Sequence, residues 1–95
     1  MNAAEPERSK IRLYIAGSSA RSSLAVSNVR CICDRCLKNC YDLEVIDIYQ
    51  QPELAEAENI IAAPTLIRKL PGPVLRIVGD MSDKDLVISI LGAAC

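Results

Sequence analysis

The stretch Ala62-Ala63-Pro64-Thr65-Leu66 constrains the fold of this chain most, because it places a proline directly before a strand-forming pair. Proline fixes its own φ, lacks an N–H donor and biases the preceding residue toward an extended conformation. Ala63-Pro64 therefore predicts a tight entry into a strand. The cis form of a bond before proline costs only about 0.5–1 kcal/mol, so Pro64 is a candidate for a cis bond.

The composition predicts one domain with an aliphatic core. The chain has 95 residues, close to the usual size for a single core, and no linker-like stretch divides it. Hydrophobic residues make up 51%, yet the aromatics are three tyrosines, so Ile, Leu, Val and Ala must fill the core, with Cys as a further candidate. A net charge of −1 argues against the broad basic surface of a nucleic-acid binder, and a protein is the expected partner.

The first residues are polar, and we expect a flexible tail over residues 1–9 followed by one domain over residues 10–95. This tail resembles neither a signal peptide nor a membrane anchor. No later apolar stretch approaches the roughly 20 residues that a membrane-spanning helix needs. We therefore expect a cytoplasmic protein, in which the five cysteines are mostly free thiols or ligands rather than a disulfide framework.

Hydrophobic periodicity predicts a β-α-β unit in the first half. Residues 10–16 alternate apolar and polar side chains, which indicates a strand. A serine of Gly17-Ser18-Ser19, or Ser22, can cap a helix that runs to about Lys38. Residues 43–49 indicate a second strand, parallel to the first through a right-handed crossover. The helix stripe expected to face the sheet consists of Val26, Val29, Cys33, Cys36, Leu37 and Cys40.

The second half predicts a short helix, two strands and a last helix. Gln51-Pro52-Glu53 opens a short acidic helical turn, and residues 65–70 indicate a third strand. A turn at residues 71–73 leads to a fourth strand over residues 74–78, antiparallel to the third. Ser82, with Asp85 three residues later, is expected to cap a last helix that ends near Gly92. The resulting order, βαβαββα, is that of a thioredoxin-like α/β domain.

Thioredoxin-like enzymes need a thiolate at the start of the first helix, where exposed N–H groups and the helix dipole lower a cysteine pKa. This chain has Ser18-Ser19-Ala20-Arg21 at that place. Serine is no substitute, because its hydroxyl needs a base and the chain has no histidine. A thiol-redox protein is the competing interpretation, and it would require reactivity at Cys33 or Cys36.

The cysteines Cys31, Cys33, Cys36 and Cys40 allow two interpretations. Cys33-x-x-Cys36, with Cys40 a turn later, resembles ligand spacing for zinc or an iron–sulfur cluster. However, the chain has no histidine ligand and no second Cys-x-x-Cys. Three of the four fall on the helix stripe that faces the sheet, where free cysteine behaves as a small hydrophobe. We therefore expect core packing, with Cys31 pointing away, and neither a metal nor another cofactor.

Three basic residues, Arg68, Lys69 and Arg76, lie on the two C-terminal strands and could form a basic face for a partner. Exposed basic residues on strands also serve to protect a sheet edge from unwanted pairing. The acidic run over residues 53–58 is expected to be a solvated face.

Several segments of the chain, taken together, carry a family resemblance. They are Leu13-Tyr14-Ile15-Ala16-Gly17, Val45-Ile46-Asp47-Ile48, Gln51-Pro52-Glu53-Leu54-Ala55-Glu56, Ala63-Pro64-Thr65-Leu66, Leu70-Pro71-Gly72-Pro73-Val74 and Ile77-Val78-Gly79-Asp80-Met81-Ser82-Asp83. In this order, with almost no gaps over residues 10–91, they resemble the KaiB family of circadian clock proteins, which has cyanobacterial and other bacterial members.

The resemblance implies a regulator without enzymatic activity that works by binding. Its implied partners are a KaiC-like ATPase, KaiA, and a histidine kinase that competes for the ATPase. It also implies two folds with a common first half: a self-associated ground state (a dimer or tetramer) of order βαββααβ, and a thioredoxin-like monomer. The positions at which the two folds could separate are Pro64, Pro71, Pro73, Ile90 and Gly92.

The chain departs from the family pattern at the partner surface and in the last helix. Ile90-Leu91-Gly92 stands where the family has Gly-Leu-Asp, and we therefore predict that the thioredoxin-like form is substantially populated. The departures favour a divergent or non-cyanobacterial version, in a clock or in a stress response. Basic family positions associated with the KaiC contact are replaced by Leu24, Glu44, Asn59 and Leu75, whereas Arg68 and Arg76 keep positive charge.

Overall fold

The computed structural model describes residues 8–37, 40–70 and 72–92. Its element order is βαβαββα, which confirms the thioredoxin-like class; the alternative order βαββααβ is not the one found here. The elements are β1 (Ser9–Ile15), α1 (Ala20–Cys36), β2 (Tyr41–Asp47), α2 (Pro52–Ala57), β3 (Thr65–Leu70), β4 (Leu75–Val78) and α3 (Lys84–Leu91).

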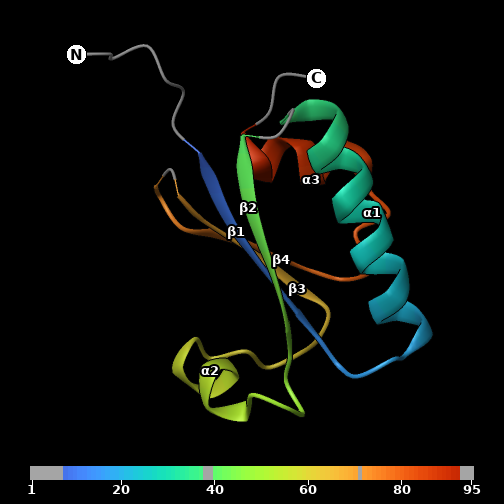
Figure 1. The fold of residues 1–95 in the computed structure, drawn as a ribbon, viewed down its shortest axis with the longest axis vertical. Helices are drawn as coiled ribbons and strands as arrows, with labels where there is room; N and C mark the ends of the chain where they lie inside the picture. Colours follow the sequence, from blue (N-terminus) through green and yellow to red (C-terminus); the bar gives the residue numbers. More distant parts are fainter. Residues whose placement is uncertain (1–7, 38–39, 71, 93–95) are drawn as a thin grey trace.

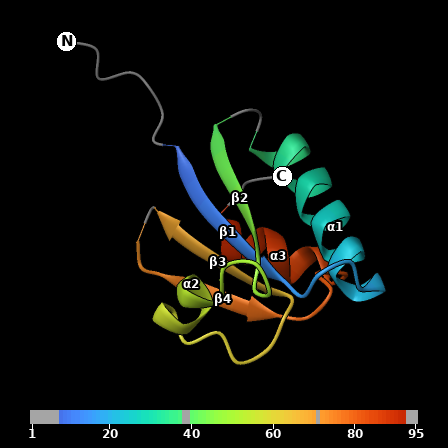
Figure 2. The same cartoon turned by 60° about the horizontal axis from the view of Figure 1, so that its bottom comes forward.

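The strands form one sheet in the order β2-β1-β3-β4. As predicted, β1 and β2 are parallel, and β3 and β4 are antiparallel; β3 also pairs antiparallel with β1. Helices α1 and α3 lie together on one side of this sheet, whereas α2 lies near one end of it (Figures 1 and 2). The two faces of the sheet are therefore covered unequally.

Strand alternation divides the apolar side chains between two cores. On the face covered by α1 and α3, Leu13 and Leu66 of the sheet pack with Val29, Val87 and other buried residues. On the opposite face, a smaller cluster beside α2 consists of Tyr14, Ile46, Ala55 and Ile67. The buried apolar cluster on this second face lies beside α2, and charged side chains such as Lys10 and Lys69 lie farther along the face.

Helix α1 begins at the predicted serine turn but presents a different stripe from the predicted one. The Ser19 hydroxyl accepts a hydrogen bond from the Ser22 amide, which is the expected capping arrangement. Of the predicted stripe, Val29 and Cys33 are buried, but Cys40 lies beyond the helix. Small side chains let a helix approach a sheet closely, and the buried face accordingly includes two of them. It consists of Ser22, Ala25, Val29, Ile32 and Cys33.

Most element boundaries differ from the predictions by one or two residues, and the start of β1, the start of β2 and the cap of α3 have an evident cause. Ser9, expected in the tail, is the first residue of β1, and its amide donates to the Cys40 carbonyl. β2 begins at Tyr41, two residues before the predicted start, because it pairs with β1 from Ser9 onward. The residue that caps α3 is Asp83 rather than Ser82, since the Asp83 carboxylate accepts from the Leu86 amide.

The prolines that bracket β3 share one feature. The Ala63-Pro64 and Gly72-Pro73 peptide bonds are both cis. Pro71, the third proline singled out from the sequence, lies outside the described residues. Within the ranges that the structure describes, no helix combines the length and the apolar character needed to cross a membrane.

Candidate functional site

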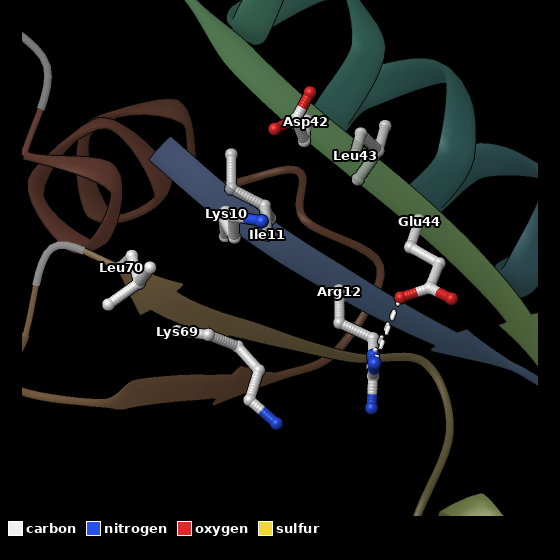
Figure 3. A pocket seen from close by; sticks show the side chains of 8 residues that line it. All are labelled: Lys10, Ile11, Arg12, Asp42, Leu43, Glu44, Lys69 and Leu70. Atoms are coloured by element: carbon white, nitrogen blue, oxygen red, sulfur yellow. Dashed lines mark hydrogen bonds and ion pairs between the residues drawn. The ribbon is translucent and has the colours of Figure 1, made fainter. Parts of the chain in front are cut away.

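The candidate site is the sheet face opposite α1 and α3, which we call the open face. Lys10 and Arg12 of β1 reach this face together with Tyr14, which belongs to the small cluster beside α2. Away from α2, the open face carries a groove of about 610 Å³ whose side chains come from three strands (Figure 3). Lys10, Ile11, Arg12, Asp42, Leu43, Glu44, Lys69 and Leu70 line it.

A register shift in β3 shapes one wall of the groove. Lys10 pairs with Leu70 and Ile11 pairs with Arg68, so Lys69 is an extra residue between two paired positions. Such a bulge re-aims the side chains next to it. As a result, the consecutive residues Lys69 and Leu70 both line the groove.

Glu58, the residue after α2, forms the centre of the charged groups on the open face. Its Oε1 lies 2.8 Å from Nη1 of Arg12, and its Oε2 lies 2.8 Å from Nζ of Lys69. The Tyr14 hydroxyl also donates to Oε1. The Glu58 side chain is only 16% exposed, which makes these contacts stronger than those of a freely solvated pair.

The protonation of this cluster follows from its hydrogen bonds. Burial acts to raise the pKa of Glu58, but the bonds from Lys69, Tyr14 and Arg12 outweigh it and lower the pKa to about 2. Burial and the bond to Glu58 raise the pKa of Tyr14, so its phenol stays protonated as a donor at neutral pH. The expectation of a solvated acidic run is therefore wrong at Glu58, because α2 folds its end back onto the sheet.

Two arginines extend the cluster across the open face. Nη2 of Arg76 donates to the Glu58 carbonyl at 3.0 Å, which ties the end of α2 to β4. Nη2 of Arg12 lies 2.9 Å from Oε1 of Glu44 and so connects β1 to β2. We call Arg12, Tyr14, Glu58, Lys69 and Arg76 the Glu58 cluster.

The structure brings together two of the three basic residues predicted to share a face. Lys69 and Arg76 both contact Glu58, one through its carboxylate and the other through its carbonyl. Arg68 is 7% exposed and pairs with Ile11, whose side chain belongs to the core under α1 and α3. The expectation of one face for all three is therefore wrong for Arg68, because strand alternation sends it to the other side.

The cysteines of α1 do not form a reactive thiol site of the thioredoxin kind. Ser19 stands at the start of α1, where the thiolate would be needed. Cys31 is exposed as predicted, whereas Cys33 is buried, and burial, with the charge of nearby Asp34, raises the pKa of Cys33 to about 12. Cys36 is disulfide-bonded, which the expectation of free thiols did not include.

Among the described residues, the Glu58 cluster provides neither a metal centre nor a free carboxylate base. Among these residues, no group of three or more His, Cys, Asp or Glu side chains is arranged to hold a metal ion. The carboxylate of Glu58 is engaged by three donors, so it offers no free base.

Comparison with known proteins adds sequence relatives. The KaiB domain family model matches residues 12–93. Circadian clock protein KaiB3 of Synechocystis sp. is 47% identical over 78 residues, which cover 82% of this chain and 76% of that protein. Circadian clock oscillator protein KaiB of a Prochlorococcus marinus strain is 45% identical over 78 residues, covering 82% of this chain and 74% of its own length.

Solved structures agree on the fold. The N-terminal domain of Synechococcus elongatus SasA has a TM-score of 0.75 at 21% identity, with 94% of this chain and 85% of that one covered. The Drosophila melanogaster thioredoxin Deadhead has a TM-score of 0.74 at 15% identity, with 90% and 80% covered. At such identities the likeness concerns the fold alone. The family match over most of the chain, together with close to half of the residues shared with curated clock proteins, shows that the chain belongs to the KaiB family.

Proposed function

We propose that this protein is a KaiB-type regulator that acts by docking on a KaiC-like ATPase, without catalysing a reaction itself. The observation that carries the proposal is the family match over residues 12–93. The open face supports it, because its described residues combine exposed charged side chains with a groove that a partner would cover. The clock proteins among the relatives favour a role in timing, and a stress response is the other setting that the divergent positions allow.

We place the docking surface on the open face around Lys69 and Arg76. Arg76 is exposed, and the Lys69 side chain is 38% exposed, so both can meet an acidic partner surface. Arg68 is excluded from this surface because it is buried. The groove beside Lys69 provides the apolar and polar contacts that a partner would fill.

A second fold of order βαββααβ, in a self-associated form, is part of this proposal. The segment that would change begins after β2, and it contains Pro64, Pro73, Ile90 and Gly92. Ile90 is half-buried in α3 and Gly92 is its C-cap, so a change to a strand would have to dismantle α3. Such a rearrangement requires that the two packings differ by only a few kcal/mol.

A binding assay with the KaiC-like ATPase of the same organism tests the docking. We expect the chain to bind the immobilised ATPase, and Lys69→Ala with Arg76→Ala to weaken binding by about tenfold, since rim charges speed association. Arg21→Ala, an exposed residue of α1, is the matched control and should leave affinity unchanged. No binding of the unaltered chain to the ATPase would contradict the proposal.

Lys69 and Arg76 also hold Glu58, so a further variant must separate charge from local structure. Glu58→Gln weakens the Glu58 cluster but frees positive charge on the open face. If the partner recognises positive charge, Glu58→Gln should retain or increase the affinity, whereas Lys69→Ala with Arg76→Ala should lower it. An equal loss in both variants would mean that local structure, not charge, decides binding.

A kinase-docking sensor module is a second candidate. The structural likeness to the SasA N-terminal domain shows the same fold, so a detached module of this kind is compatible with it. Replacing the immobilised ATPase by a histidine kinase of the organism in the same assay distinguishes the two. Binding to the kinase without binding to the ATPase would favour the sensor module.

A further inference from the structure

Arg68 is a buried cation without an ionic partner among the described residues. Its residue is 7% exposed, and its Nε has no hydrogen-bond partner in the described structure. Nη2 donates to the Pro73 carbonyl at 3.2 Å, which lies in the turn between β3 and β4. A buried charged group that is only partly hydrogen-bonded raises the free energy of the folded state. We therefore expect another interaction to stabilise the Arg68 guanidinium.

The end of α3 lies directly against this guanidinium. Gly92, the C-cap of α3, has φ +68°, and its amide donates to the carbonyls of Ile88 and Ser89. A Cβ added at Gly92 would lie 2.7 Å from Nη1 of Arg68. The preceding residue, Leu91, is 2% exposed in the core, so the last turn of α3 cannot move aside without losing apolar contacts.

The electrostatics of a helix end explain why a cation is placed there. The last carbonyls of a helix have no partner within it and carry partial negative charge. A guanidinium close to that end is therefore attracted to α3 while it bonds to the β3–β4 turn. Through this one side chain, β3 contacts both the turn that follows it and the final turn of α3.

We propose that Arg68 and Gly92 form a latch, in which the buried guanidinium keeps the last turn of α3 docked and Gly92 is required because it leaves room for that group. The latch concerns the protein alone and holds whether or not an ATPase is the partner. With this latch, the separation of α3 from the sheet depends on the charge of Arg68 as well as on the burial of apolar side chains.

Amide hydrogen exchange of the full chain tests the latch. Arg68→Met keeps the apolar stem but removes the charge, and we expect exchange at residues 87–92 to become faster by roughly 3- to 30-fold, the effect of losing a cation at a helix end. Exchange in the centre of β1 should change less. Lys69→Met is the matched control on the same strand, and it should leave α3 selectively unaffected.

If the buried charge were only a cost, Arg68→Met would slow exchange in α3 or leave it unchanged, and either result would overturn the proposal. A second comparison tests the space at Gly92. We compare the effect of Gly92→Ala in the unaltered protein with its effect in the Arg68→Ala variant. The increase in the exchange rate of α3 should be at least about threefold larger in the unaltered protein, since the two residues are in contact. Equal effects in both backgrounds would show that only the positive φ requires glycine, which would also overturn the latch.

Discussion

Glu58 shows how a single residue can connect four elements of this protein. Its carboxylate receives donors from β1 and β3, its carbonyl receives Arg76 of β4, and its own backbone follows α2 directly. A carboxylate satisfied in this way is far more stable ionised than protonated. The contribution of the Glu58 cluster to stability should therefore depend on pH.

We predict that Glu58→Gln destabilises the protein at pH 6 by on the order of 2 kcal/mol, with the difference shrinking below pH 4.5. The Glu58 pKa falls from an ordinary 4.5 to about 2, so the unfolded chain binds the proton more readily. The stabilisation is complete above pH 4.5 and is lost as pH falls toward 2. Urea unfolding at pH 6 and pH 3 measures it.

Glu56→Gln is the matched control, because Glu56 is exposed on α2 next to this site. Its effect should be within about 0.5 kcal/mol at both pH values, as for most exposed substitutions. A Glu58→Gln effect that is the same at pH 6 and pH 3 would show that the carboxylate is not held ionised by its partners.

The two neighbouring thiols Cys31 and Cys33 should differ in reactivity. Cys31 is exposed on α1, whereas Cys33 is 0% exposed with its pKa raised to about 12. We expect iodoacetamide at pH 8 to modify Cys31 in the native protein and to spare Cys33 until guanidinium is added. Peptide mapping by mass spectrometry gives the result. Rapid native modification of Cys33 would revive the thiol-redox interpretation.

At the scale of elements, the irregularity in β3 determines the chemistry of the open face. Strict alternation would have placed Leu70 with Arg68 on the side of α1 and α3. The register shift instead sets Leu70 opposite Lys10, and Lys69 and Leu70 both line the groove. One inserted residue thus adds an apolar contact to a charged surface.

The start of α3 gives a prediction at the same scale. Because the Asp83 carboxylate accepts from the Leu86 amide, Asp83→Ala should cost about 1 kcal/mol of folding stability. Asp83→Asn should retain most of that stability, since asparagine is an equally good cap. Ser82→Ala should cost less than half as much, as measured by urea unfolding. A larger loss for Ser82→Ala would restore the cap predicted from the sequence.

At the scale of the whole molecule, the two faces of the sheet are covered unequally and differ in composition. The face under α1 and α3 contains the larger core, with Leu13, Val29 and Leu66 completely buried. The opposite face is closed only beside α2 and is charged elsewhere (Figures 2 and 3). Substitutions of Lys69 or Arg76 on the open face should therefore affect stability through Glu58 as well as surface charge.

We predict that the thioredoxin-like form is substantially populated in solution. Residues 88–91 lie in α3, and this part of the chain lacks the Gly-Leu-Asp pattern that the family resemblance implies for the last helix. Size-exclusion chromatography should show a monomer, and backbone chemical shifts should be helical at residues 88–91. A homogeneous tetramer in which those residues are extended would refute the prediction.

The sequence alone determined the order of the elements, the parallel β1–β2 pairing and the family. These follow from periodicities, cap residues and proline positions, which are local and can be read within a short window. The bounds of β3 were predicted without error, because Pro64 and the 71–73 turn enclose it. The family could be identified because short motifs in a fixed order are visible in the sequence itself.

Only the tertiary structure decided which charges meet. Arg12 and Glu58 are 46 residues apart in the chain, and no local pattern indicates that α2 brings them into contact. Arg68 likewise lies against Gly92 at the end of α3, which is 24 residues away along the chain. Hydrophobic periodicity predicts which face of the sheet each strand residue occupies. Contacts between distant charges depend instead on how the elements pack and on the bulge in β3, which the alternation of apolar and polar residues does not indicate.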